Sequence, residues 1–91
     1  MPVTVRIPSP LRSLSDGMSE AQVDATDVRG AIEQLEAAHP GFRERLLDDD
    51  SQLRRFVNVF VRDEDVRFLN GLDTPVEDGD VVSIVPAVAG G

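Results

Sequence analysis

One long segment with helical periodicity divides a chain whose other main patterns are typical of strands. After the potential N-cap Thr26-Asp27, apolar residues recur at helical spacing from Val28 to Ala38, and His39-Pro40-Gly41 ends the pattern. The opposite side of this segment is mostly polar. A single amphipathic helix can cover one face of one sheet, so the pattern predicts a two-layer domain.

The segment before this helix contains two strand patterns. Residues 3–7 alternate apolar and polar side chains and end at Pro8, which lacks the amide hydrogen that a strand ladder needs. Residues 13–17 are typical of a turn, and residues 21–25 are expected to return as the second strand of an antiparallel hairpin.

After the helix, residues 42–47 are expected to add a short helical turn, and residues 56–61 form the clearest strand pattern of the chain. Residues 66–68 are expected to form a short return strand, and residues 81–85 the last strand. This order predicts an α+β fold, the ubiquitin-like β-grasp, with one main helix packed on one face of a mixed sheet. The first and last strands are expected to lie parallel at its centre.

Charge and composition exclude several classes of function. The 91 residues carry a net charge of −8, whereas nucleic-acid binding needs a basic face, so no nucleic-acid partner is expected. The chain contains no cysteine, which excludes disulfides, thiolate nucleophiles and zinc–thiolate sites. No apolar run approaches the about 18 residues of a membrane span, so we expect a cytoplasmic protein without a membrane partner.

The C-terminal end is the candidate reactive site. Five small residues follow Pro86 and end in Gly90-Gly91, so we predict a β-grasp domain over residues 1–86 and a flexible tail over residues 87–91. Such a tail spans about 17 Å when extended, and glycines without a Cβ fit a narrow cleft. The Gly91 carboxylate is ionised at neutral pH and can attack the α-phosphate of ATP on a partner enzyme.

The resulting acyl-adenylate can react with a sulfur nucleophile to give a thiocarboxylate. All nine basic residues are arginine, so no lysine side chain is available to capture the activated end within the same molecule.

The end of the chain resembles the sulfur carriers of the ThiS/MoaD family. The resemblance lies in Asp78-Gly79-Asp80, in Val82 and Ile84, and in the segment from Pro86 to Gly91. Residues 55–68 are similar to CysO-type carriers in particular, and a looser similarity extends over nearly the whole chain.

This resemblance implies a carrier that binds no cofactor and catalyses no reaction of its own. It implies activation by an E1-like adenylyltransferase of the MoeB/ThiF type, which uses ATP and Mg²⁺, often with a rhodanese-type sulfur donor. The implied recipient is a sulfur-accepting enzyme such as a cysteine synthase or a thiosugar or thiazole synthase. Within the tail, Gly90 and Gly91 match the functional residues of the family.

A partner-binding surface is expected on the sheet face opposite the helix. Phe60, Val81, Ser83 and Val85 are predicted to share this face, which is partly apolar and adjacent to the tail. A cleft that receives the tail would in addition contact Pro86, Ala87, Val88, Ala89 and Gly90.

Three other functions stay open at this point. The same activated end would serve a ubiquitin-like modifier joined to lysines of other proteins, and the small subunit of molybdopterin synthase looks similar. An adaptor without a reactive end is the third alternative. His39, the acidic runs at residues 48–50 and 63–65, and the serines at 9, 13 and 15 match no catalytic or calcium-binding pattern.

Overall fold

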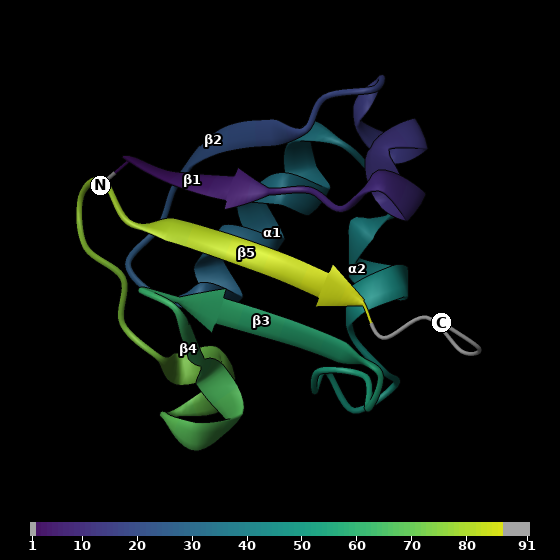
Figure 1. Ribbon diagram of the computed structural model, residues 1–91. Helices are drawn as coiled ribbons and strands as arrows, with labels where there is room; N and C mark the ends of the chain where they lie inside the picture. Colours follow the sequence, from purple (N-terminus) through teal and green to yellow (C-terminus); the bar gives the residue numbers. More distant parts are fainter. Residues whose placement is uncertain (1, 87–91) are drawn as a thin grey trace.

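The structure is a computed structural model that describes residues 2–86, and within them one five-stranded sheet carries its helices on one face (Figure 1). The spatial order is β2-β1-β5-β3-β4. Strands β1 and β5 are parallel, and every other neighbouring pair is antiparallel. The strands are β1 (Pro2–Arg6), β2 (Glu20–Asp24), β3 (Val57–Val61), β4 (Glu64–Asp65) and β5 (Val81–Pro86).

This arrangement confirms the predicted α+β fold with β5 at the centre of the sheet. Helix α1 (Val28–Ala38) begins where expected, because the Asp27 Oδ1 atom accepts a hydrogen bond of 2.7 Å from the Gly30 amide. The helix α2 (Phe42–Leu46) follows Gly41, whose φ of 115° favours glycine. No helix among residues 2–86 is long and apolar enough to cross a bilayer.

The core lies between the sheet and α1. Alternate residues of β3 and β5 point toward the helix, and Val59, Val82 and Ile84 are at most 4% exposed. On the helix side, the buried residues are Val28, Ala31, Ile32 and Leu35, which are four of the five apolar positions in the helical pattern. The fifth, Ala38, lies in the last turn and is exposed.

The predicted return strand at residues 66–68 is wrong. These residues form a 3₁₀ helix, η2 (Val66–Phe68), because the Asp65 Oδ1 atom accepts a hydrogen bond of 2.9 Å from the Arg67 amide. The return strand is β4, which follows β3 after the two-residue turn Arg62-Asp63. Both turn residues have positive φ, 52° and 65°, as a tight hairpin turn requires.

Smaller differences also occur. The segment that was expected to be a turn at residues 13–17 belongs largely to a 3₁₀ helix, η1 (Ser9–Ser15), and a further 3₁₀ helix, η3 (Gly71–Asp73), precedes β5. Strand β3 begins at Val57, one residue later than expected. The predicted boundary between domain and tail falls after Pro86, the last described residue, and it stays a prediction.

Candidate functional site: the open sheet face and the end of β5

The face of the sheet opposite α1 carries the four residues that were expected to bind a partner. Val81, Ser83 and Val85 alternate with the buried Val82 and Ile84 along β5. In the ladder between β3 and β5, Phe60 lies opposite Ser83, and Asn58 lies opposite Val85. The four predicted residues therefore share one face, although their part in partner binding stays a prediction.

This face is mixed in character. Val85 is 45% exposed, whereas Phe60, Val81 and Ser83 are half-buried. The Arg67 guanidinium reaches back to β3, where it donates to the Asn58 Oδ1 atom at 2.7 Å and to the Arg54 carbonyl at 2.6 Å. The side chain of Arg67 therefore holds η2 against the beginning of β3.

Sequence reasoning missed the exposed aromatic side chains that border β3. Phe56, directly before the strand, is 54% exposed, and Phe68, at the end of η2, is 86% exposed. Phe56 was assigned to the strand and Phe68 to a return strand, so neither stood out as a surface residue. The density of phenylalanine in residues 56–68 was the available signal, because this segment holds three of the four phenylalanines of the chain.

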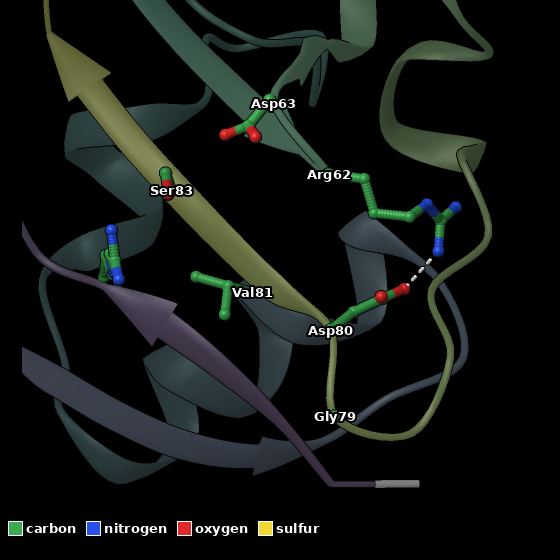
Figure 2. Close-up of a pocket in the computed structure, with 7 residues that line it drawn as sticks. Arg62, Asp63, Gly79, Asp80, Val81 and Ser83 are labelled. Atoms are coloured by element: carbon green, nitrogen blue, oxygen red, sulfur yellow. Dashed lines mark hydrogen bonds and ion pairs between the residues drawn. The ribbon is translucent and has the colours of Figure 1, made fainter.

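A hollow of about 340 Å³ lies on the same face near the beginning of β5 (Figure 2). Two of the predicted residues, Val81 and Ser83, line it. Figure 2 shows that the Arg62 side chain points away from Ser83 and toward Asp80. The other residues that line the hollow are Arg6, Asp63 and Gly79.

Arg62 connects the β3–β4 turn to the loop before β5. Its Nη1 atom lies 2.5 Å from the Asp80 Oδ2 atom and 3.4 Å from the Glu77 Oε2 atom. The same Asp80 oxygen accepts a hydrogen bond of 2.7 Å from the Glu77 amide. Arg62 and Asp80 both line the hollow, and these contacts fix their side chains in its wall. No group of three acidic or histidine residues that could hold a metal occurs within residues 2–86.

Strand β5 brings the chain to one end of the sheet. Its last residue, Pro86, pairs with Val57, the first residue of β3, so the chain leaves the described domain beside Phe56. The remaining predicted site residues lie outside the described residues, and their predicted roles are untested. These residues are Ala87, Val88, Ala89, Gly90 and Gly91.

A family model covers nearly the whole chain, from residue 5 to residue 91, and its description is the ThiS family. This chain belongs to the ThiS family. The matched region includes both terminal glycines, so the family resemblance is not confined to the globular part.

The proteins similar in sequence to this ThiS-family chain include a sulfur carrier and a protein modifier. It is 48% identical over 93 residues to the sulfur carrier protein CysO of Mycobacterium tuberculosis, with both chains covered completely. It is 41% identical over 68 residues to the small archaeal modifier protein 3 of Haloferax volcanii, which covers 75% of this chain and 72% of that protein.

A solved structure supports the fold and the family. The ThiS-family chain superposes on a chain of the Amycolatopsis orientalis BexX/CysO complex with a TM-score of 0.93 and 45% sequence identity. The match covers 98% of this chain and 99% of that chain. The two proteins therefore share one fold over almost their whole lengths.

Proposed function

We propose that this protein is a sulfur carrier whose reactive group is the carboxylate of Gly91. The observation that carries the proposal is the 48% identity to the sulfur carrier CysO over the full length of both chains. The family match supports it further, because it extends to Gly91 itself. In this role the protein is a cosubstrate of other enzymes and catalyses no step of its own.

Activation is proposed to occur on an E1-like adenylyltransferase of the MoeB/ThiF type. A carboxylate oxygen of Gly91 attacks the α-phosphorus of ATP, and pyrophosphate leaves with the electrons of the broken P–O bond. ATP and Mg²⁺ belong to that partner, and no cofactor is assigned to the carrier. Because this step consumes ATP, we assign the protein to the cytoplasm.

Sulfur then replaces AMP on the acyl group. Hydrosulfide attacks the Gly91 carbonyl carbon, AMP departs and one proton is released, which leaves a thiocarboxylate. If the sulfur comes instead from the persulfide of a rhodanese-type donor, its terminal sulfur displaces AMP and an acyl disulfide forms. A second thiol then attacks the donor's own sulfur, forms a disulfide with it, and releases the thiocarboxylate and a proton. The lack of lysine removes side-chain amines that would otherwise compete for the adenylate within the carrier.

The open sheet face is proposed to contact the enzymes that act on the tail. Val85 directly precedes the last residue of β5, and Phe60 lies opposite Ser83 on the same face, so a surface bound there holds the end of the chain at a defined distance. We propose a sulfur-accepting biosynthetic enzyme, such as a cysteine synthase, as the recipient. The structure of the Amycolatopsis orientalis BexX/CysO complex supports partner binding, because there a similar protein is bound to a second protein.

The proposal is tested by intact-mass spectrometry. The full-length protein is incubated with ATP, Mg²⁺, an E1-like adenylyltransferase and a sulfide source. The expected product is heavier by the difference between one sulfur and one oxygen atom, and its C-terminal fragment carries the change. The same incubation with the Gly91 deletion variant is expected to give no product. An unchanged mass of the full-length protein, under conditions in which a known carrier is converted, contradicts the proposal.

A second candidate function is a ubiquitin-like modifier, because the chain is 41% identical to an archaeal modifier protein over three quarters of its length. Both functions begin with the same adenylate and diverge in the nucleophile that attacks it. Conjugates that survive reducing denaturing electrophoresis and contain Gly91 linked to a lysine of another protein would support the modifier. A thiocarboxylate without such conjugates supports the carrier.

A further inference from the structure

Within residues 2–86, the end of β5 is held in the sheet by β3 alone (Figure 1). Strand β1 pairs with β5 no further than Ser83, whereas β3 pairs with it as far as Pro86. The Thr4 amide donates to the Asp80 carbonyl at 2.9 Å, so Asp80 and the even residues that follow it in β5 face β1. Successive residues of a strand direct their amides to opposite sides, and Val85 therefore faces β3.

The last hydrogen bonds of this ladder belong to Asn58 and Val85. These two residues lie opposite each other, and both direct their main-chain groups into the ladder. The next pair, Val57 with Pro86, adds no such bond. Proline has no amide hydrogen, and the Val57 amide donates instead to the Arg54 carbonyl at 3.0 Å. Among the described residues, Asn58 is thus the last anchor of the chain before it leaves the sheet.

Arg67 fixes this part of β3 from outside the sheet. Strand β4 pairs only with Phe60 and Val61, so no strand of the described chain lies on that side of the beginning of β3. The Arg67 guanidinium occupies this side instead. Its Nη1 atom donates to the Asn58 Oδ1 atom at 2.7 Å, and its Nη2 atom donates to the Arg54 carbonyl at 2.6 Å. One planar group therefore joins both ends of a five-residue segment.

Both sides of this connection are themselves held by other contacts. The Arg54 amide donates to the Leu46 carbonyl, and the Arg54 Nε atom donates to the Glu44 carbonyl, each at 3.0 Å, which ties the segment to α2. The Arg67 amide donates to the Asp65 Oδ1 atom at 2.9 Å within η2. The guanidinium thus links two fixed parts of the domain across the beginning of β3.

We propose that Arg67 is a positioning residue for the reactions of the carrier, an inference that rests on the proposed function. It acts through Asn58, because it holds the residue that makes the last hydrogen bonds to Val85. It thereby fixes the point at which the segment that ends in Gly91 begins. Without the guanidinium, the end of β5 opens together with the beginning of β3. A partner enzyme then has to order this end when it binds, at a cost in affinity.

The first measurement is amide hydrogen exchange of the free full-length protein, followed by NMR. Arg67→Met keeps a long side chain but removes its donors, and it is expected to accelerate exchange of the Val85 amide about tenfold. The Val82 amide, which faces β1, is the internal control and should change by less than about twofold. Arg29→Met is the matched control, because it removes an equal charge and a bond to the Ser51 carbonyl beside α1. It should leave both amides unchanged.

A double-mutant cycle tests whether Arg67 acts through Asn58. Asn58→Val removes the Oδ1 acceptor and introduces a residue that strands favour. Alone, it is expected to accelerate exchange of the Val85 amide several-fold. Added to Arg67→Met, it should change that exchange by less than about twofold, because the two residues share one interaction.

The second measurement is adenylation by an E1-like adenylyltransferase, followed by pyrophosphate release. Arg67→Met is expected to raise the KM for the carrier about threefold or more and to leave kcat within about twofold, because the loss precedes the chemical step. Arg67→Lys retains a charge and donors, so it should recover part of the KM and part of the exchange protection at Val85.

Unchanged exchange at Val85, equal acceleration at Val82, additive effects of the two substitutions in the cycle, or a lower kcat with an unchanged KM would each overturn the proposal. A higher KM with unchanged exchange would also overturn it, since Arg67 would then contact the partner directly. If the wild-type protein is not adenylated, the proposed function fails, whereas the exchange measurements still decide whether Arg67 fixes the end of β5.

Discussion

Replacement of Val82 by aspartate tests the assignment of faces on the central strand. Val82 is 1% exposed and lies in register between Val5 of β1 and Val61 of β3, which are also 1% exposed. Val82→Asp forfeits about 1.5–3 kcal/mol of apolar burial. The neighbouring side chains are valines without donors, so the new carboxyl group costs about 2–7 kcal/mol more even as a neutral, unpaired buried polar group.

This loss is comparable with the whole free energy of unfolding. Native proteins are stable by roughly 5–15 kcal/mol, and small domains lie near the lower limit. Val82→Asp is therefore expected to leave the domain largely unfolded at 25 °C, with loss of the circular dichroism signal of the folded state and of the cooperative transition in urea.

Val85→Asp is the matched control, because it makes the same chemical change on the same strand. Val85 is 45% exposed on the opposite face, so its variant should lose less than about 1 kcal/mol. The two variants are compared by urea denaturation and thermal melting. Equal midpoints for the two variants would refute the reasoning, since they would show that both positions face the same environment.

Three further predictions concern the tail, the open face and the hollow. Deletion of Gly91 should abolish adenylation, measured by pyrophosphate release, while the melting temperature measured by calorimetry stays unchanged. A clear fall in the melting temperature would contradict the prediction that the tail contributes nothing to the core. Phe60→Arg should raise the dissociation constant for the E1-like adenylyltransferase by about tenfold, with a much smaller effect on stability, because apolar contacts dominate such surfaces; unchanged affinity in a calorimetric titration would exclude Phe60 from the interface. Arg62→Gly should be more stable in urea than Arg62→Ala by about 0.5–1 kcal/mol, because both lose the same ion pairs to Glu77 and Asp80 but only glycine adopts a φ of 52° without strain. The reverse order would show that the turn is not strained.

The amino-acid sequence alone determined which residues face the core in most elements. The alternation in residues 57–61 and 81–85 and the helical spacing after Asp27 correctly predicted the buried positions, including Val59, Val82 and Leu35. These predictions succeed because the direction of a side chain depends on local backbone geometry, with a period of two in a strand and 3.6 in a helix. The order of these elements was also sufficient to predict the parallel pairing of the first and last strands.

Only the tertiary structure determined the features that depend on contacts between segments distant in the chain. The 3₁₀ helix η2 is held in place by the burial of Val66 and by the hydrogen bonds of the Arg67 guanidinium to Asn58 and to the Arg54 carbonyl. The hollow depends on Arg62 and Asp80, which are 18 residues apart in the chain. Within residues 2–86, the position of β2 at the edge of the sheet likewise follows from how the five strands are ordered. Periodicity contains no information on such contacts, because they depend on which surfaces the whole chain buries together.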